Sequence, residues 1–535
     1  MVGLIVVMGL LYLPALRFSR FGTFHDDSIY VTTAKSLATG QGYRIISLPY
    51  EPAQTKYPPF YPILLSMIWR AYPKFPTNLI AMMLLSTVVT IVLLVTTWRY
   101  LTDHLYSAVP LANIVIVLTA LNWRTLILAT SIFSEMLFAF LSVAALYLAE
   151  KYEKERAHPP LALLLGILMG LTFLTRSSGI ALMIAVGSYF FVRRRWRQAL
   201  LPLGVASLFV IGWVVWSYAN RTTFSTGNAT YYTSYVKDFA SILNDVGDHS
   251  ISAKLGAIAN IVVENLIGAI VVSIPVVCTG LNYGSVASLS GLSLGLTVGT
   301  ILLFFLVIAA GFVRHSLRGF RLLHYFVISY LALHLFWPYA SYDRFLMCVL
   351  PFLLLFFITE FELPISLIKR KASSQISGKM SAGFIAIMLF LCAGVLLFSY
   401  IYGISQTLSS LNEADKHSAE DYRLIDWINQ YTNGDDILIC YRDPKYYLYT
   451  GRKAISFSWP KKGSSWEGQQ DLIRRIVNET KGRYLILTST DFNHDYDEQL
   501  QRESLRSLVN QSPDIFTKVF STEPDGIIYR IDTHD

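Results

Sequence analysis

The sequence predicts a polytopic α-helical membrane protein with a small soluble α/β domain at its C-terminal end. Three observations predict this class. Of 535 residues, 53% are hydrophobic and 15% are charged, which is too apolar for an ordinary soluble protein. Apolar stretches that could cross about 30 Å of hydrocarbon recur up to residue 402. Beyond that point, helical and strand patterns alternate.

The apolar part contains eleven candidate spans, which we expect to be α-helices because lipid offers no partner for unpaired backbone groups. The first, Met1–Ala15, lacks a basic start and a cleavage site, so we expect a retained span rather than a signal peptide. The stretch 256–286 carries Glu264, Asn265 and Pro275, and we expect an interfacial or re-entrant helix there. If this stretch crosses the membrane instead, the C-terminal tail is cytoplasmic.

Basic residues lie on alternate connectors between the spans, at 99–104, 151–156, 193–197, 314–321 and 369–379. Short basic connectors remain in the cytoplasm, so the net charge of +8 reflects membrane topology rather than a nucleic-acid surface. The long polar loops 17–77 and 218–260 are then extracytoplasmic. With a cytoplasmic N-terminus and eleven crossings, the soluble tail is extracytoplasmic too.

These patterns divide the chain into a membrane domain, 1–403, and an α/β domain, 404–535. In the tail we expect a helix at 418–431, a buried strand at 436–441 and a second strand in the sequence RYLILTS. Further helices are expected at 471–479 and 496–510, followed by a hairpin that turns at 524–526. The tail lacks a phosphate loop, a nucleophile elbow and metal-ligand spacing, so we expect it to pack or to dock an acceptor.

The first outer loop carries the most informative residues. Asp26 and Asp27 follow the first span by about ten residues, with His25 before them and Tyr30 one turn later. Two adjacent carboxylates near a membrane surface are costly, which favours a functional role. The alternative is that they cap the N-terminus of a helix, where carboxylates satisfy unpaired N–H groups.

An amphipathic helix, 31–39, follows the acidic pair, and then a GQGY turn and the segment KYPPFYP. The prolines of this segment predict an extended conformation without a helix. They place Lys56 beside a rigid turn close to the membrane surface.

This loop resembles the GT-C superfamily of membrane glycosyltransferases that use polyprenyl-phosphate sugars. The branch includes the aminoarabinose transferases, the protein O-mannosyltransferases and the RgtA-to-D-like lipopolysaccharide enzymes. The resemblance covers about 45 residues, agrees in order and spacing, and rests on Asp26, Asp27, Tyr30, Gly40, Gly42, Tyr43, Lys56, Pro58 and Pro59. It implies a GT-C-like fold with about eleven transmembrane helices.

Three further charged residues lie at expected outer ends of spans. Glu135 follows Ser134 at the start of a span, where it is either functional or a helix-start carboxylate. Arg176 and Arg344 lie outside against the positive-inside trend. Each either binds a lipid phosphate, or snorkels or pairs with Asp343.

The resemblance implies sugar transfer from a polyprenyl phosphate to an acceptor hydroxyl, usually with inversion at the anomeric carbon. It assigns Asp26, or Asp27 if the register shifts by one, as the base that takes the acceptor proton. Lys56 and Arg344, with Arg176 and Tyr30 as weaker candidates, are expected to bind the donor phosphate. His25, Tyr57 and Glu135 are further substrate-site candidates, and the polar segment 221–240 is an expected lid.

A required metal is not predicted. The aminoarabinose transferases have a metal-binding acidic residue before the loop lysine, whereas this chain has Thr55, and Glu51 is a poor substitute. Mg²⁺ or Mn²⁺ at the phosphate remains chemically reasonable. Cys278, Cys348, Cys392 and Cys440 lack the spacing of a metal site or a disulfide framework.

Two other functions stay open. One is a transporter or channel with an outer sensor domain, although the charges cluster at span ends rather than at mid-membrane. The other is an oligosaccharide ligase that uses a pyrophosphate-linked donor. The resemblance favours a bacterial plasma (inner) membrane with the site on the periplasmic side, and as partners a polyprenyl-phosphate sugar, membrane lipid and an acceptor glycan, glycolipid or protein.

Overall fold

The computed structural model describes most of the chain. The described residues are 2–105, 109–155, 158–221, 251–281, 291–337, 342–360, 376–456, 477, 480–488, 506, 509–510, 513, 515–523 and 525–532. Packing divides the chain into two compact units. We call them the membrane unit (Met1–Ala15, Leu84–Trp213 and Ser241–Leu408) and the loop–tail unit (Leu16–Met83, Val214–Ala240 and Ser409–Asp535). The predicted boundary at residue 404 stays a prediction.

Five helical runs among the described residues are long and apolar enough to cross a membrane. They are Asn78–Asp103 (α4), Trp196–Ala219 (α10), Ser252–Thr279, Ser293–Leu317 and Phe390–Tyr431. The third run consists of α13 (Ile251–Asn265), the π-helix η4 (Leu266–Ser273) and α14 (Ile274–Thr279). The last two belong to α16 (Gly291–Leu317) and α21 (Ile376–Tyr431).

A bent pair forms a sixth candidate span. Helices α5 (Val109–Leu121) and α6 (Trp123–Ala129) meet at 65°. The bend lies at Asn122, whose extended backbone ends α5 and whose side chain accepts a hydrogen bond from the backbone N–H of Arg124. This side chain therefore caps α6.

The remaining helices of the membrane unit are shorter or carry more charge. They are α1 (Val2–Tyr12), η1 (Leu13–Ala15), α7 (Glu135–Lys154), α8 (Pro159–Thr175), η3 (Ser177–Gly179), α9 (Ile180–Val192), α17 (Leu322–His334), α18 (Tyr342–Leu346) and α19 (Leu350–Thr359). Several of the expected spans are thus shorter than 18 residues. The count of eleven crossings stays a prediction.

Close packing joins these helices into one core. A Cβ added to Gly311 of α16 would lie 1.9 Å from the carbonyl oxygen of Phe356 in α19, so only glycine allows this approach. Phe326 and Tyr330 of α17 are fully buried in the same core. Helices α16, α17 and α19 therefore contribute to one hydrophobic core.

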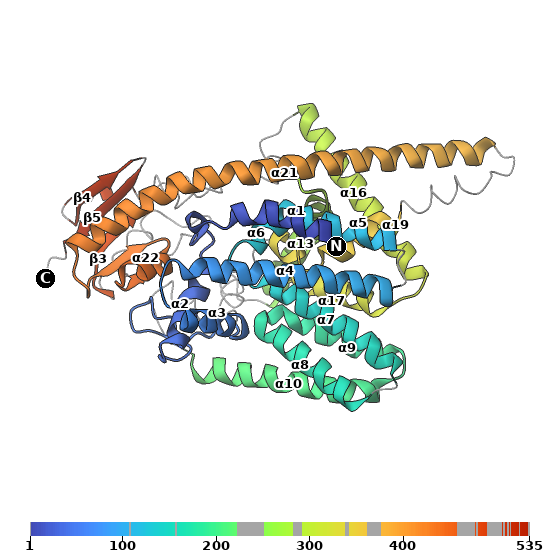
Figure 1. Cartoon of the computed structure of the whole chain (residues 1–535), viewed down its shortest axis with the longest axis horizontal. Coiled ribbons are helices and arrows are strands. Elements are labelled where there is room, and N and C mark those ends of the chain that lie inside the picture. The colour runs from blue at the N-terminus through green and yellow to red at the C-terminus, as the bar shows by residue number, and fades with distance from the viewer. Residues whose placement is uncertain are drawn as a thin grey trace. The chain divides into compact units, whose positions relative to one another are not determined.

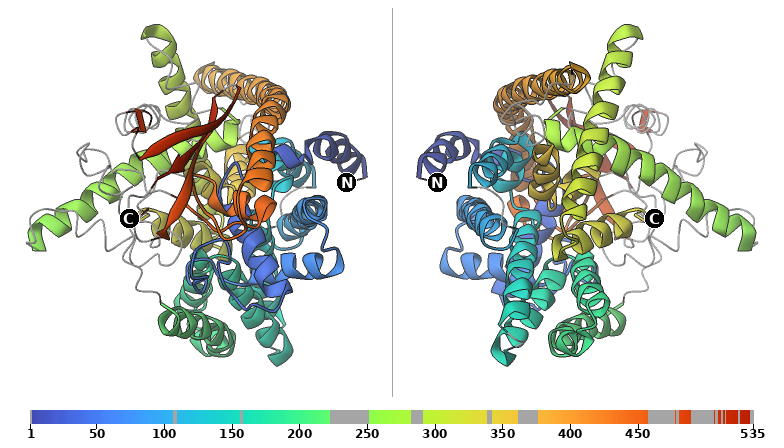
Figure 2. Two further views of the ribbon diagram at one scale, coloured as in Figure 1. Left: turned by 90° about the vertical axis from the view of Figure 1, so that its left-hand side faces the viewer. Right: turned by 90° about the vertical axis from the view of Figure 1, so that its right-hand side faces the viewer.

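The run Ser252–Thr279 has a direction of its own. In Figure 2, α4 and α10 are seen nearly end-on, whereas this bright green run lies across the view. Its length and composition would allow a crossing. The interfacial or re-entrant helix expected for this part of the sequence stays a prediction.

The loop–tail unit contains η2 (Phe18–Arg20), α2 (Asp26–Ala38), α3 (Phe60–Ala71) and a five-stranded sheet of order β2-β1-β3-β5-β4. The strands are β1 (Ile437–Cys440), β2 (Ala454–Ile455), β3 (Gly482–Leu487), β4 (Phe516–Thr522) and β5 (Gly526–Ile531). Strand β1 pairs in parallel with β2 and β3, and β5 pairs antiparallel with β3 and β4.

Helix α21 continues from the apolar segment into this sheet domain without a break (Figure 1). Leu424, Ile425 and Ile428 on one face of it pack against the sheet, as the sequence pattern predicted for 418–431. The strands at 436–441 and in RYLILTS and the final hairpin are confirmed. The helices expected at 471–479 and 496–510, and the turn residue Pro524, lie largely outside the described residues.

Sequence reasoning missed helix α22 (Asp443–Thr450) and strand β2. The sequence does carry a signal for α22: Pro444 lies in its first turn and Gly451 follows its last residue. In the structure Gly451 ends the helix with a φ of 73°. The tyrosine-rich sequence between them lacks an apolar periodicity. This helix turns out to contact the first loop.

Candidate active site

The acidic pair begins α2, and its two carboxylates have different surroundings. Asp27 is 2% exposed, and its oxygens accept hydrogen bonds from the backbone N–H groups of Gly22 (2.8 Å) and Ser28 (2.7 Å). Burial raises the pKa of Asp27 to about 6, although these two bonds oppose the rise. Of the two donors, only Ser28 belongs to the first turn of α2, and the N-cap residue His25 makes no side-chain capping bond.

Asp26 is partly exposed and contacts the proline-rich segment. The hydroxyl of Tyr57 donates a hydrogen bond of 2.6 Å to Oδ1 of Asp26. The ring of Tyr57 packs edge-on against that of Tyr30, at 5.3 Å between centroids, and Tyr30 is 3% exposed. Tyr57, the residue after Lys56, thus contacts Asp26, the first residue of the acidic pair.

Backbone hydrogen bonds hold the segment around Lys56 in place. Oε1 of Gln54 accepts from the backbone N–H groups of Lys56 (2.9 Å) and Tyr57 (3.2 Å). The hydroxyl of Tyr43 donates to the carbonyl of Tyr57 at 2.7 Å, and the indole N–H of Trp216 donates to the carbonyl of Gln54 at 3.0 Å. Lys56 itself is 3% exposed.

The expectation that KYPPFYP contains no helix is wrong for its second half. Helix α3 begins at Phe60, with Pro62 in its first turn. Proline is compatible with a first turn because the N–H groups there have no helical partner in any case. The extended part is limited to the residues before Phe60.

The C-terminal tail packs directly on this loop. Nε2 of His25 lies 3.0 Å from Oδ1 of Asp443, at the start of α22, and Asp443 is fully buried. Lys453 forms an ion pair with Glu51, so the acidic residue nearest Thr55 binds the tail. The first loop and the tail are therefore in direct contact through two charged pairs. The packing role expected for the tail agrees with these contacts.

A buried charge cluster anchors α22 within the tail. Nζ of Lys445 lies 2.5 Å from Oδ2 of Asp421, and Nη1 of Arg442 lies 3.5 Å from the same oxygen. Burial alone would raise the pKa of Asp421, but the two cations outweigh it and lower the pKa. A Cβ added at Gly22 would come within 2.5 Å of the Lys445 side chain. The charge cluster therefore packs closely against Gly22, whose backbone N–H donates to Asp27.

The membrane unit holds a second group of predicted residues. Glu135, at the start of α7, is fully buried and lies 2.9 Å from Nη1 of Arg176. Arg344 also forms an ion pair with Glu135, and its guanidinium lies over the ring of Phe133 at 4.3 Å. One carboxylate thus holds two guanidiniums, which leaves net positive charge. We call these three charged residues the arginine cluster.

The pairing of Arg344 with Asp343 that the sequence allowed is not what the structure has. Asp343 instead pairs with Arg124, at 2.6 Å. Sequence reasoning missed Arg124 because it lies inside an apolar stretch, at the start of α6. The Asn122 bend turns this residue toward the carbonyl of Leu281, to which it donates at 2.8 Å.

The structure therefore divides the predicted site residues between the two units. His25, Asp26, Asp27, Tyr30, Lys56 and Tyr57 belong to the loop–tail unit, and Glu135, Arg176 and Arg344 to the membrane unit. The expected lid at 221–240 lies outside the described residues after Arg221. Within the described ranges, no three His, Cys, Asp or Glu side chains gather as a metal site.

No protein-family model and no curated protein matches the chain. Solved structures do match. The Archaeoglobus fulgidus oligosaccharyltransferase complex with Zn and sulfate is 14% identical with a TM-score of 0.57, over 98% of this chain and 72% of that one. ArnT from Cupriavidus metallidurans bound to undecaprenyl phosphate is 12% identical with a TM-score of 0.54, over 99% and 97%.

The chain shares the fold of these proteins. A further structure, archaeal AglB from Archaeoglobus fulgidus in complex with an inhibitory peptide and a dolichol-phosphate, is 12% identical with a TM-score of 0.53, over 99% of this chain and 74% of that one. The predicted GT-C-like fold, a multi-pass helical membrane protein with a C-terminal domain, is thereby confirmed. At these identities the likeness concerns the fold alone.

Proposed function

We propose that this chain is a membrane glycosyltransferase that transfers a sugar from a polyprenyl-phosphate-linked donor to an acceptor hydroxyl. The observation that carries the proposal is the 2.6 Å hydrogen bond between Tyr57 and Asp26, which joins the acidic pair to the segment of Lys56. Two residue types that this reaction needs, a carboxylate base and a cation, thus lie on segments that are anchored to each other.

Asp26 is the proposed base. It takes the proton of the acceptor hydroxyl while that oxygen forms a bond to the anomeric carbon, and the bond from this carbon to the phosphate oxygen breaks. Polyprenyl phosphate then leaves with the bonding electrons. Asp27 is the weaker candidate, because backbone N–H groups already occupy both of its oxygens.

Lys56 is the proposed cation for the departing phosphate. The arginine cluster is a proposed anion-binding group of the membrane unit, because a guanidinium offers several N–H donors in a plane and can bind two phosphate oxygens. Tyr57 and Tyr30 position Asp26 and the loop. The dolichol-phosphate and undecaprenyl phosphate bound by proteins of the same fold support a lipid phosphate as ligand.

The residues near Asp26 do not fit a metal cage of protein ligands. Both oxygens of Asp27 accept backbone N–H groups, His25 contacts Asp443, and Glu51 pairs with Lys453. A Mg²⁺ or Mn²⁺ ion would therefore be held by Asp26 together with phosphate oxygens, and it would neutralise charge on the phosphate. The Zn and sulfate complex of a protein with this fold makes a divalent cation reasonable.

The site is proposed to face the periplasm of a bacterial inner membrane. Two observations support this proposal: the first loop contacts the tail, and the basic connectors are expected on the cytoplasmic side under the positive-inside rule. The transferred sugar is proposed to be a hexose or a pentose. A transporter function is less well supported, because the charges gather at helix ends.

The deciding experiment supplies the purified protein with two donors in the presence of a membrane extract as acceptor. One donor is an undecaprenyl-phosphate-linked sugar, and the other is an undecaprenyl-pyrophosphate-linked oligosaccharide. Release of undecaprenyl phosphate from the first supports the proposal. Release of undecaprenyl pyrophosphate from the second alone would indicate an oligosaccharide ligase, the second candidate, since oligosaccharyltransferases share this fold.

Asp26→Asn should lower transfer by about 10²- to 10⁴-fold, the usual contribution of a general base. Asp415→Asn is the matched control, because Asp415 belongs to the same unit and pairs at the surface with Arg17. Near-normal transfer by the double variant Asp26→Asn/Asp27→Asn would eliminate the proposed base. Substrate flux into liposomes without a lipid-linked sugar would favour a transporter.

A further inference from the structure

A second charged group lies at the far end of the helices that carry the arginine cluster. Helix α7 starts at Glu135 and ends at Lys154. At about 1.5 Å per residue, the distance along it from Glu135 to Glu153 is about 27 Å. This length is close to the hydrocarbon thickness of about 30 Å. The separation of the two charged groups along α7 is therefore about the thickness of the hydrocarbon.

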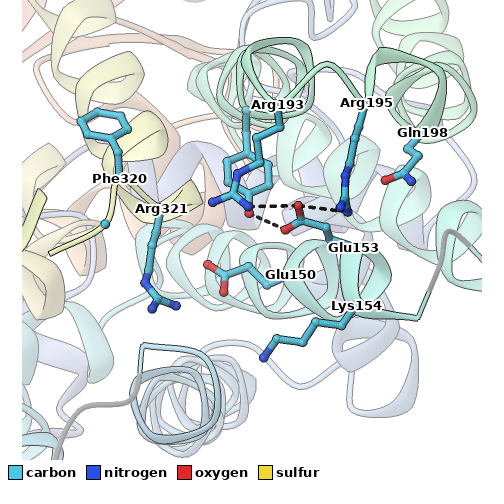
Figure 3. A pocket seen from close by; sticks show the side chains of 10 residues that line it. Glu150, Glu153, Lys154, Arg193, Arg195, Gln198, Phe320 and Arg321 are labelled. Carbon is cyan, nitrogen blue, oxygen red and sulfur yellow. Dashed lines mark hydrogen bonds and ion pairs between the residues drawn. The ribbon is translucent and has the colours of Figure 1, made fainter.

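This far end contains an open pocket with a volume of about 690 Å³. Its charged lining consists of Glu150, Glu153, Lys154, Arg193, Arg195 and Arg321, so cations outnumber carboxylates. Figure 3 shows Arg193 and Arg195 directed toward Glu153, while Arg321 lies across the pocket on the other side of Glu150. The four cations come from three of the basic connectors of the sequence, 151–156, 193–197 and 314–321.

Glu153 holds the two arginines in fixed positions. Its Oε1 lies 3.2 Å from Nη1 of Arg193 and 3.3 Å from Nη1 of Arg195, and its Oε2 accepts a 2.5 Å hydrogen bond from the hydroxyl of Tyr189. The carboxylate side chain is 12% exposed, whereas the arginines are 44% and 48% exposed. Each guanidinium thus uses one nitrogen for Glu153 and presents further N–H donors to the pocket.

The pocket also presents an acceptor. The buried Oε1 of Gln198 has no hydrogen-bond partner among the described residues, and a buried acceptor of this kind is costly unless a donor reaches it. Guanidinium donors beside an amide acceptor suit a phosphate ester that carries a neighbouring hydroxyl. A phosphoglycerol headgroup has this chemistry.

The surroundings of the pocket indicate a lipid rather than a soluble anion. Phe191 and Val192, at the end of α9, are 73% and 63% exposed, and Trp196 at the start of α10 is 50% exposed. Phe320, which lines the pocket, is 41% exposed. Exposed aromatic side chains beside charged ones are typical of the headgroup level of a membrane.

We propose that this pocket binds the headgroup of an anionic phospholipid of the phosphatidylglycerol class, from the leaflet that faces the basic connectors. Basic pockets between transmembrane helices on this side are suited to anionic headgroups. Arg193 and Arg195 bind the phosphate, and Gln198 accepts a hydrogen bond from a glycerol hydroxyl. The site is separate from the proposed transferase chemistry, at the other end of α7.

The test is native mass spectrometry of the purified full-length chain in detergent, with phosphatidylglycerol, phosphatidylcholine or undecaprenyl phosphate added. The pocket variant is Arg193→Gln/Arg195→Gln. The control is Arg194→Gln/Arg197→Gln, which removes the same charge from exposed neighbours that do not line the pocket. Phosphatidylglycerol binding should fall by about tenfold or more in the pocket variant and remain within about twofold in the control.

Three results would overturn the proposal. Equal losses in both double variants would indicate diffuse charge attraction, and unchanged binding in the pocket variant would show that the arginines are not used. A stronger pocket-dependent binding of undecaprenyl phosphate than of phosphatidylglycerol would assign the pocket to the polyprenyl lipid instead. Competition by millimolar inorganic phosphate distinguishes a soluble anion site, which it empties, from a lipid site, which it does not.

A milder variant protects the test against misfolding. Gln198→Leu keeps every charge and should weaken phosphatidylglycerol, which has headgroup hydroxyls, more than phosphatidic acid, which lacks them. Equal binding of both lipids to this variant and to the unchanged chain would refute the hydroxyl contact. Retained binding of phosphatidic acid shows that the variant is folded.

Discussion

Removing the buried carboxylate of Asp421 should open the C-terminal domain. Asp421, Lys445 and Arg442 are 2%, 3% and 7% exposed, and Asp421 is the carboxylate that both cations contact. Breaking a buried ion pair by removing one partner costs about 3–5 kcal/mol, because the remaining charge is left without compensation in a dry site. We therefore expect Asp421→Asn to destabilise the domain by about that amount.

Cys440 provides a built-in measurement of this opening. Its thiol lies on β1 and is fully buried in the core of the domain, beside Leu424 and Leu438. If a thiol reagent reaches Cys440 only after the domain opens, its labelling rate reports the opening free energy. A cost of about 3–5 kcal/mol should then raise the rate by about two to three and a half orders of magnitude.

The assay is maleimide labelling of the full chain in detergent, read by mass spectrometry of the peptide that contains Cys440. Cys278 and Cys348, buried in the membrane unit, are internal references whose labelling should not change. Asp426→Asn is the matched control, because this aspartate is exposed on the same helix. Equal Cys440 labelling in Asp421→Asn and Asp426→Asn would refute the claim that the buried cluster holds the domain together.

Three further predictions concern the charged sites. Tyr57→Phe removes the hydrogen-bond donor to Asp26 and should lower the turnover rate about 10- to 100-fold, since a hydrogen bond to a charged group contributes about 1.5–3 kcal/mol. Tyr50→Phe, at an exposed position of the same loop, should leave the rate unchanged. An equal rate for both variants would contradict the positioning role of Tyr57. Glu135→Gln should lower the thermal stability in detergent by the equivalent of about 3–5 kcal/mol, whereas Glu155→Gln at an exposed pair should change it by less than about 0.5 kcal/mol. Asp27 has a folded pKa of about 6, above its ordinary 3.8, so its contribution to stability is complete at low pH and is lost as pH rises through 6. Asp27→Asn lacks this titration, so its stability relative to the unchanged chain should rise by about 2.4 kcal/mol between pH 4 and pH 7 in thermal-unfolding experiments. A constant difference would disprove the assignment.

Part of the candidate site could be predicted because it lies within one short segment. The order and spacing of the acidic pair, the GQGY turn and the prolines around Lys56 identified this segment, whereas the hydrogen bond between Tyr57 and Asp26 was not predicted. The sequence did not show which of the two aspartates would be held by backbone N–H groups and which would face Tyr57. Backbone N–H groups of Gly22 and Ser28 occupy Asp27, and a sequence pattern does not show where a loop returns its backbone.

Long-range partners explain the remaining misses. Arg344 had an acidic neighbour in sequence, Asp343, yet it pairs with Glu135, and Asp343 pairs with Arg124. The contact between His25 and Asp443 joins residues 418 positions apart. Such choices depend on which helices become neighbours, and periodicity in one segment carries no information about that.

By itself the sequence determined the membrane class and the helical content, because lipid requires long apolar helices. It also determined part of the local conformation of the first loop, because prolines and glycines act locally. Tertiary structure alone decided that α22 packs on the acidic loop, that one carboxylate holds two arginines, and that a basic pocket forms at the opposite end of α7. The physical reason is that charge pairing in a dry environment depends on positions within a few ångströms, and only the packed fold sets those positions.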